Sequence, residues 1–425
     1  MRQRNRRTVA IAAGTALVVL CTLMTISGGL TFDTLAASGT LTPKAYLPYI
    51  SKQPTPTSTP SGLPTEIPVS TEPAEEDAPQ IARHGYQVYV AWYSGNNSYV
   101  KTSTAGGWAW GLPVTIAGRH PAIAVDVNGT LHVCYDYSGT VYCIQSTDGG
   151  QTFTSPLSLG AGCSPDITVD ASGKPYVVWQ EQCSGPDAFT NVILGRFTVQ
   201  GYGPINLTAT ITKTVVGATA INLDYSEPPK VAVSPSGRNV YVIWKCPPYY
   251  GDYVRTYFAR STDGGNTFGS RFNPTGFIRH GEYSPDVAAF GENIVYITWV
   301  LDQYHDCRAN FARSGNSGRS FSSRLELGNS GSDHDSTIAA DDRGQVCVAW
   351  RQGPEQDTNL YFRCSINGGQ SFLPARLLVS GPPGTSQYEA ALVLWNSNSS
   401  TYLDAVWEDT RNSSQDIYFS SILVR

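Results

Sequence analysis

The sequence predicts an all-β protein built from seven repeated units, and its composition and two recurring patterns support this. Only 15% of its 425 residues are charged, 11% are aromatic, and the chain contains 41 Gly and 27 Pro. Aromatic residues favour strands and Gly and Pro favour tight turns, whereas helix bundles are rich in Ala, Glu, Lys and Leu. The hydrophobic fraction of 41% is high enough for a packed core, which excludes wholesale disorder.

The first pattern is a hydrophobic strand that ends in an aromatic residue. Six copies end in Trp, as in YVAW and YITW, and HVCY takes the same place in the second unit. Each follows a short apolar strand such as PAIAVD, which begins at Pro121. Seven units of three or four short strands, beginning at about residue 79, predict a seven-bladed β-propeller with four-stranded antiparallel blades, with six blades as the alternative. The seven strand ends are Trp92, Tyr135, Trp179, Trp244, Trp299, Trp350 and Trp407.

The second pattern is a tight turn between the third and fourth strands of a unit. It reads STDGGQTF from Ser146 and STDGGNTF from Ser261, and Asn replaces Asp in the copies from Ser314 and Ser365. The Asp or Asn side chain accepts hydrogen bonds from turn amides, the Gly pair allows unusual dihedral angles, and the last aromatic ring packs between sheets. We therefore expect these residues to be structural. They are Ser146, Asp148, Gly150, Thr152, Phe153, Ser261, Asp263, Gly265, Thr267, Phe268, Asn316, Phe321, Asn367 and Phe372.

These turns resemble the Asp-box, or BNR repeat, of the sialidase superfamily, which has the form Ser-x-Asp-x-Gly-x-Thr-Trp/Phe. The resemblance extends over residues 79–425 and implies a sialidase-like propeller. The usual propeller of that family has six blades, and the motif also occurs in propellers that are not sialidases. The resemblance therefore implies a fold and leaves the activity open.

The N-terminal part of the chain predicts export. Four arginines precede an uncharged run from Val9 to Ile26, and small residues follow it, so we interpret 1–38 as a signal peptide or an N-terminal membrane anchor. Residues 39–61 form a linker rich in Pro, Thr and Ser, and 62–425 form the propeller. The last unit lacks a fourth strand, so residues 62–70 are predicted to supply it and close the ring.

Export makes the cysteines of the propeller candidates for disulfides, because no closely spaced Cys or His residues resemble a zinc site. Cys134 and Cys143 flank a two-residue turn symmetrically, so they face each other across two strands. Alignment of the sixth unit with the second opposes Cys347 and Cys364 in the same way. The remaining cysteines are predicted to join loops near one face, as the pairs Cys163–Cys183 and Cys246–Cys307.

The charge balance limits the partners. The formal net charge is −5, and the first 38 residues are basic, so the propeller is acidic and nucleic acid is excluded as the main partner. No phosphate-binding loop or metal-ligand pattern occurs, so we expect no cofactor and no metal. We predict a secreted or cell-surface monomer whose contact with a membrane is limited to an uncleaved N-terminal segment.

The loops between second and third strands and the connections between blades share one face, here called the top face, which is polar and aromatic. Sialidases bind the substrate carboxylate with three Arg and use a Tyr nucleophile paired with Glu, and an Asp as acid/base. Their Arg-Ile-Pro strand is replaced here by Ala78-Pro79-Gln80-Ile81. The residues that best fit the remaining roles are Tyr283, Glu282 and Asp306 for catalysis, and Arg351, Arg411, Tyr250 and Tyr304 for substrate binding.

Because the arginine motif is missing, we expect an exported, sialidase-like propeller that binds a glycan or an extracellular protein without catalysis. The alternative is a glycoside hydrolase of the exo-α-sialidase type. A structural surface protein is the third possibility.

Overall fold

The computed structural model describes residues 65–70, 75–183, 189–200, 208–220, 227–246, 253–276, 280–328, 332–354, 356–412 and 414–425. The predicted signal or anchor (1–38), the linker (39–61) and Tyr250 lie outside these residues. No helix in the described part of the chain is long and apolar enough to cross a membrane.

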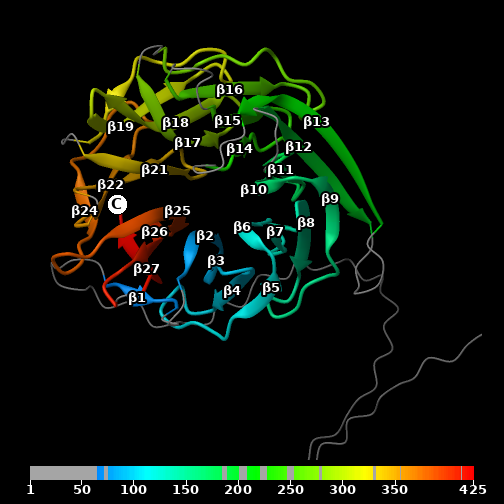
Figure 1. Ribbon diagram of the computed structural model, residues 1–425, viewed down its shortest axis with the longest axis horizontal. Coiled ribbons are helices and arrows are strands. Elements are labelled where there is room, and N and C mark those ends of the chain that lie inside the picture. The colour runs from blue at the N-terminus through cyan, green and yellow to red at the C-terminus, as the bar shows by residue number, and fades with distance from the viewer. Residues whose placement is uncertain are drawn as a thin grey trace, which may run out of the picture. The chain divides into compact units, whose positions relative to one another are not determined.

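Seven antiparallel sheets surround a central channel (Figure 1), which confirms the predicted seven-bladed propeller. In each of the first six blades the chain runs from the innermost strand outward. Blades 1 to 3 comprise β2 (Asp77–His84), β3 (Gln87–Ser94), β4 (Asn97–Ser103) and β5 (Val114–Ala117); β6 (Arg119–Val125), β7 (Leu131–Tyr137), β8 (Thr140–Ser146) and β9 (Leu157–Ala161); and β10 (Cys163–Val169), β11 (Pro175–Gln180), β12 (Phe189–Gln200) and β13 (Thr208–Ala220).

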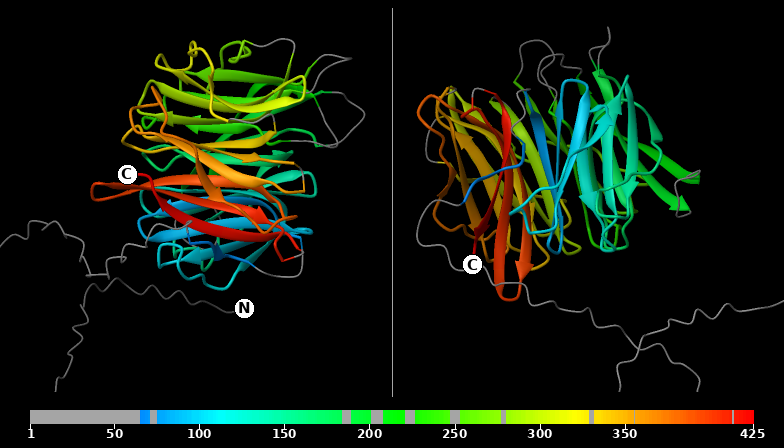
Figure 2. Two further views of the ribbon diagram at one scale, coloured as in Figure 1. Left: turned by 90° about the vertical axis from the view of Figure 1, so that its left-hand side faces the viewer. Right: turned by 90° about the horizontal axis from the view of Figure 1, so that it is seen from below.

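Blades 4 to 7 continue the ring. They comprise β14 (Lys230–Val233), β15 (Val240–Cys246) and β16 (Arg255–Ser261); β17 (Gly281–Phe290), β18 (Ile294–Gln303), β19 (Asp306–Ser314) and β20 (Leu325–Glu326); β21 (Asp333–Ala340), β22 (Val346–Gln352), β23 (Asn359–Ser365) and β24 (Arg376–Val379); and β25 (Gln387–Ser397), β26 (Ser400–Asp409), β27 (Asp416–Leu423) and β1 (Ile67–Pro68). The side views in Figure 2 show the β25–β26 hairpin reaching past its neighbours.

Blade 4 departs from the predicted four strands, because its described residues form three. In place of a fourth strand, Phe272 forms an isolated bridge with Phe258, and their backbone N–H groups and carbonyls exchange hydrogen bonds of 2.9 and 3.0 Å. The Phe272 ring also packs edge-on against Phe258. A single bridge therefore covers the outer edge of this blade.

Blade 7 draws its strands from both ends of the propeller. The short strand β1 pairs antiparallel with β27, with Ile67 opposite Phe419, and it lies within the segment 62–70 from which the sequence predicts a closing strand. Val69 is buried beside Val88 and Phe419 in a cluster shared by blades 1 and 7. Pairing of a distant segment with the last strand covers an edge that would otherwise be open.

The core lies between adjacent sheets. The six Trp residues at the ends of the second strands are almost fully buried, and Trp179 of blade 3 packs against Cys134 and Val141 of blade 2. Burial of a large apolar side chain contributes about 1.5 to 3 kcal/mol. The aromatic residues that the composition shows in excess are therefore mainly scaffold.

The Asp-box turns have the hydrogen bonds that their residues predict. Asp148 Oδ1 accepts hydrogen bonds from Ser146 Oγ (2.7 Å) and from the amide of Thr152 (3.0 Å). In the turn that uses Asn, Asn316 Oδ1 accepts from the amide of Ser320 (3.0 Å). Gly150 has a φ of +82°, and a Cβ there would lie 2.7 Å from Thr102 Oγ1 of blade 1, so the turn requires glycine.

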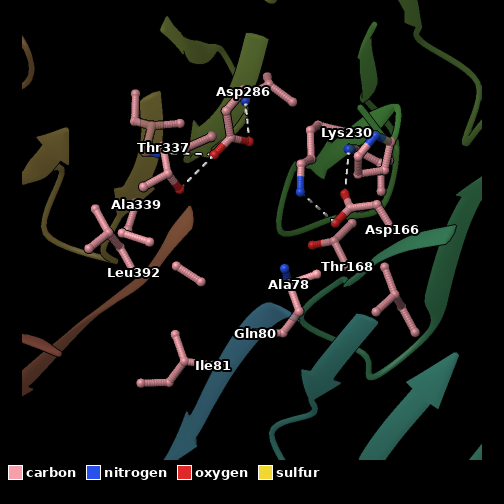
Figure 3. Close-up of a pocket in the computed structure, with 18 of the residues that line it drawn as sticks. Ala78, Gln80, Ile81, Asp166, Thr168, Lys230, Asp286, Thr337, Ala339 and Leu392 are labelled. Atoms are coloured by element: carbon pink, nitrogen blue, oxygen red, sulfur yellow. Dashed lines mark hydrogen bonds and ion pairs between the residues drawn. The ribbon is translucent and has the colours of Figure 1, made fainter. Parts of the chain in front are cut away.

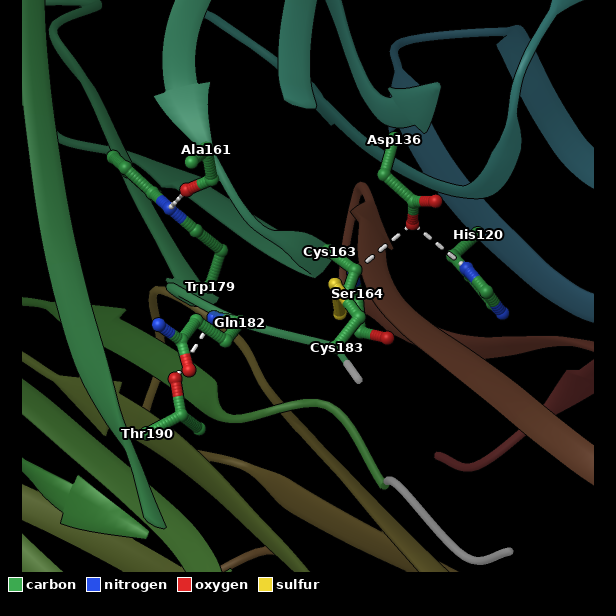
Figure 4. The surroundings of a disulfide bond; sticks show 9 residues. All are labelled: His120, Asp136, Ala161, Cys163, Ser164, Trp179, Gln182, Cys183 and Thr190. Atoms are coloured by element: carbon green, nitrogen blue, oxygen red, sulfur yellow. Dashed lines mark hydrogen bonds and ion pairs between the residues drawn. A yellow bond between two sulfur atoms is a disulfide. The ribbon is translucent and has the colours of Figure 1, made fainter. Parts of the chain in front are cut away.

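Three disulfides occur in the described residues, namely Cys134–Cys143, Cys347–Cys364 and Cys163–Cys183. The first two join residues that are directly opposite in neighbouring strands. The third ties the start of β10 to the segment after β11 (Figure 4). Disulfides are typical of oxidising compartments outside the cytoplasm. The pairing of Cys246 with Cys307 stays a prediction.

Candidate functional site: the mouth of the channel

The innermost strands share a kink where they begin on the top face. In six blades the register with the second strand shifts by a β-bulge at this point. The bulged residue has a positive φ of 28° to 51°, although it is not glycine. Bulges change the direction of side chains and often lie beside functional sites. The six residues are Ala78, His120, Ser164, Ser284, Asp335 and Glu389.

These strands line a cavity of about 710 Å³ in the channel (Figure 3), which we call the mouth. Six carboxyl side chains and one lysine are among its lining residues, and no arginine is. A cavity lined by one sign of charge concentrates ligands of the opposite sign. The charged lining residues are Asp77, Asp166, Glu227, Asp286, Asp335, Glu389 and Lys230.

Lys230 lies among these carboxylates, and Figure 3 shows it directed into the channel beside Asp166. Its Nζ is 3.8 Å from Asp166 Oδ1. Burial lowers the pKa of Lys230, but the surrounding carboxylates, with Asp166 and Asp286 foremost, together outweigh burial and the net change is upward. Burial raises the pKa of Asp166 to about 6. Lys230 is thus positively charged, and its single charge neutralises only part of the negative charge of the carboxylates around it.

Two of the mouth carboxylates, Asp77 and Glu389, meet Glu408 at the junction of blades 7 and 1. Oxygen atoms of Asp77, Glu389 and Glu408 lie within 4.8 Å of one another. Burial, followed by the charges of Asp77 and Asp335, raises the pKa of Glu389 to about 7. Burial also raises the pKa of Glu408 well above its ordinary value. Such a group can hold a shared proton, and carboxylate oxygens of this kind can also bind a hard cation.

The structure does not bring Glu282 and Tyr283 together as a catalytic pair. Neighbours in a strand point to opposite faces. Glu282 is fully buried, and its Oε2 accepts hydrogen bonds from the amide of Thr256 (2.7 Å) and from Asn273 Nδ2 (3.1 Å). Its carboxylate therefore joins blade 5 to blade 4.

Tyr283 lies beside charged residues that the sequence analysis did not connect with it. Lys245 Nζ lies 5.7 Å from the centre of the Tyr283 ring and donates to Glu227 Oε1 at 2.7 Å. Burial, and then the charges of Asp302, Cys307 and Glu227, raise the pKa of Tyr283. A tyrosine nucleophile needs a base or a lowered pKa. This tyrosine is held in its protonated form.

The other predicted catalytic and carboxylate-binding residues are occupied by partners within the chain. Both oxygens of Asp306 accept hydrogen bonds from Arg308 at 2.9 Å, and the Arg308 guanidinium lowers the pKa of Asp306. Arg351 Nε lies 2.8 Å from Asp335 Oδ2. Arg411 pairs with Asp409 and Glu66, and its guanidinium stacks on Tyr418. Arg351 and Arg411 are therefore already neutralised.

Among the predicted binding residues that the structure describes, Tyr304 is the most exposed. It lies in the turn between β18 and β19, with 81% of its surface exposed. Its ring centre is 5.2 Å from that of His280, and the His280 ring is 6.3 Å from Tyr253. We call these three residues the rim shelf. No motif in the sequence marks His280.

No family model and no curated protein matches the sequence. Among solved structures, a PL25 ulvan lyase is similar with a TM-score of 0.54 at 10% identity, over 83% of this chain and 94% of the lyase. The Hadza microbial sialidase Hz136 matches with a TM-score of 0.45 at 10% identity, over 82% of this chain and 66% of the sialidase. YCF48 bound to D1 peptide matches with a TM-score of 0.49 at 12% identity, over 87% of this chain and 97% of YCF48. At 10% identity the likeness to the ulvan lyase shows the fold alone.

Proposed function

We propose that this protein is an exported propeller that binds its ligand at the mouth of the channel without catalysing a reaction. The observation that carries the proposal is that the two candidate arginines already form ion pairs within the chain. A sialidase-type site needs arginines that are available to a substrate carboxylate, and Arg351 and Arg411 are each paired with carboxylates of this chain. The mouth itself presents six carboxyl groups and one lysine.

The charge of the mouth is unfavourable for anionic sugars. Like charges brought together at a binding site cost several kcal/mol. This applies to a sialoside, and equally to the uronate and sulfated sugar -[GlcA(1-4)Rha3S]- that is bound to the ulvan lyase. Tyr283 adds a second obstacle to sialidase chemistry, because its pKa is raised and Glu282 is occupied in another contact.

The shape of the site supports binding. Ligand pockets typically measure about 300 to 1,000 Å³, and the mouth falls in this range. The exposed aromatic rings of the rim shelf are available beside it. We therefore infer that a neutral or positively charged ligand, either a glycan or part of an extracellular protein, docks on the top face.

The test combines turnover and binding with the exported protein. It is incubated with a fluorogenic sialoside and screened on arrays of glycans and peptides. We expect no turnover, and binding that Glu389→Gln weakens at the mouth. Glu292→Gln is the matched control, because it makes the same change at the turn before β18 on the opposite face. Turnover that Tyr283→Phe abolishes would overturn the proposal, as would ligand binding that is equally strong in both Glu→Gln variants.

A further inference from the structure

The turn that carries Tyr304 has an unusual backbone for its residues. Gln303 pairs with Asp306, so Tyr304 and His305 form a two-residue turn, and their φ angles are +61° and +68°. Turns of this kind favour Asn-Gly, because a bulky side chain is unfavourable at a positive φ. The equivalent turn of blade 2 is Ser138-Gly139. The fold therefore does not require aromatic residues at this position.

The consequence of this conformation is an exposed aromatic surface. The rim shelf combines residues from three separate segments, which precede β16, precede β17 and follow β18. Tyr304 is 81% exposed and Tyr253 is 46% exposed, and His280 lies between them. Exposed aromatic groups mark interaction surfaces, and tyrosines provide contact area with little loss of entropy.

The rim shelf is connected to the mouth through one short stretch of chain. His280 belongs to the shelf, and Ser284, four residues later, lines the mouth. The amide of Ser284 donates to Glu227 Oε2 (2.7 Å), which places a carboxylate of the mouth beside this stretch. A ligand that covers both regions therefore needs to span only about 13 Å of extended chain.

The charge near the shelf favours a cationic ligand. The basic residues Lys245 and Arg308 are paired with Glu227 and Asp306. Two mouth carboxylates, Glu227 and Asp335, are paired with Lys245 and Arg351. The other four, Asp77, Asp166, Asp286 and Glu389, share the single positive charge of Lys230. The faces of tyrosine rings also attract lysine and arginine side chains. An acidic partner would be repelled by these carboxylates, and a neutral ligand would offer no positive charge to pair with them. Electrostatic complementarity therefore favours a cationic partner.

We propose that the rim shelf and the mouth together bind an extended protein segment that bears lysine or arginine. The aromatic rings of the shelf stack against the segment and its cationic groups, and the carboxylates of the mouth neutralise its charge. This inference rests on the proposed binding function and names the partner class.

The test measures fluorescence anisotropy of labelled peptides with the full exported chain. The probes are a peptide of alternating Gly and Arg, the corresponding Gly-Glu peptide, and a labelled neutral oligosaccharide. We expect the Arg peptide to bind and the Glu peptide not to bind. Tyr304→Ala should weaken binding of the Arg peptide about tenfold, because it removes the central contact of the shelf.

Tyr137→Ala is the matched control, since Tyr137 is 49% exposed beside the equivalent turn of blade 2. General attraction of a polycation to an acidic protein would be the same in Tyr304→Ala and Tyr137→Ala, and this result would overturn the inference. Failure of the Arg peptide to bind would also overturn it. If the neutral oligosaccharide binds instead and Tyr304→Ala abolishes that binding, the binding function stands and the partner class is wrong. Unchanged melting temperatures show that the variants are folded.

Discussion

Glu408 of blade 7 accepts a hydrogen bond from the backbone amide of Ala78 in blade 1, over a distance of 2.8 Å. Ala78 is the bulged residue of its strand, so a carboxylate from the preceding blade holds the amide of the bulge in place. The same contact recurs at two other junctions between blades. It joins Asp136 to Ser164 (3.0 Å) and Glu227 to Ser284 (2.7 Å).

The recurring contact explains part of the acidity around the channel. Backbone N–H groups at a bulge lose their ladder partners, and a buried unpaired N–H is costly. Carboxylates of the neighbouring blade satisfy these donors. Asp166 and Asp286 act similarly, because they accept hydrogen bonds from the amides of Val231 and Ile338 in the next blade.

Replacement of Asp136 tests the structural role of this contact. Asp136 Oδ1 also lies 2.7 Å from His120 Nδ1. Figure 4 shows this contact as a dashed line between the two side chains. We expect Asp136→Ala to lower the free energy of unfolding by about 1 to 3 kcal/mol, because the amide of Ser164 loses its acceptor. Asp136→Asn keeps an oxygen acceptor and should cost less. The measurement is urea unfolding. Equal stability of the Ala variant and the natural protein would show that this contact does not stabilise the fold.

The Asp-box turns occur in two forms, one with Asp and one with Asn, so the chain itself shows which replacement of Asp148 the turn tolerates. Asp148→Ala removes the acceptor for the amide of Thr152 and should destabilise the protein by about 1 kcal/mol. Asp148→Asn should be close to neutral, because Asn316 already makes the equivalent bond to the amide of Ser320. Thermal unfolding of both variants checks this. A loss of stability that is the same for Asn and Ala would show that the charge of Asp148 matters more than its hydrogen bonds.

The sequence predicts the number of blades, the turns and the cross-strand disulfides because each depends on residues that are close together in a repeat. Cys134 and Cys143 show this well, since a two-residue turn determines that they are opposed. One partner of Arg411 depends on the closed ring instead. Arg411 pairs with Glu66, 345 residues away, and this contact exists only once blade 7 contains strands from both ends.

The sequence indicates that charged residues at the starts of the innermost strands surround the channel, and the lining residues Asp166, Lys230 and Asp286 confirm this, but it does not give the bulge that directs each side chain. Glu227 precedes β14 in blade 4, and Glu389 is the bulged residue of β25 in blade 7, so no local pattern connects the two. One signal in the sequence could have indicated the bulge. Proline follows the bulged residue in four blades, at Pro79, Pro121, Pro165 and Pro285. The positive φ of the preceding residue could not be predicted, because residues before proline usually adopt an extended conformation.

The junction between blades 7 and 1 predicts a pH effect. Glu76 is buried, and its Oε1 accepts hydrogen bonds from Ser70 Oγ and from Trp92 Nε1 (3.0 Å). Burial raises the pKa of Glu76 to about 7 from 4.5. The folded chain therefore binds this proton more tightly than the unfolded chain, and the contribution of Glu76 to stability falls as the pH rises between these values.

Glu76→Gln keeps an acceptor without the charge. We expect the variant to exceed the natural protein in free energy of unfolding by about 1 to 3 kcal/mol at pH 8. At pH 4 the carboxyl is neutral in the folded chain and largely neutral in the unfolded chain, so the difference should almost vanish. Denaturant unfolding at the two pH values provides the comparison. A difference that does not depend on pH would show that the pKa of Glu76 is not raised.

The backbone of the turn at Tyr304 and His305 predicts that one double replacement will raise the stability of the protein and weaken its binding of the Arg peptide. Replacing both residues in Tyr304→Asn/His305→Gly installs the sequence that this turn prefers. The amide of residue 305 still donates to Asp302 Oδ1, as it does now at 2.7 Å. We expect the free energy of unfolding to rise by about 1 to 2 kcal/mol, because two residues at a positive φ are relieved of strain. Binding of the Arg peptide should fall at the same time.

The reverse change in blade 2 controls for the effect of the turn itself. Ser138→Tyr/Gly139→His places the aromatic pair in an equivalent turn with φ angles of +49° and +73°. It should destabilise the protein by a similar amount, and it should not create a second shelf, since His280 and Tyr253 lie in other blades. If the Asn-Gly variant is no more stable than the natural protein, contacts of Tyr304 with His280 offset the strain. The turn would then be a relaxed structure, and its aromatic residues would need no binding function to explain them.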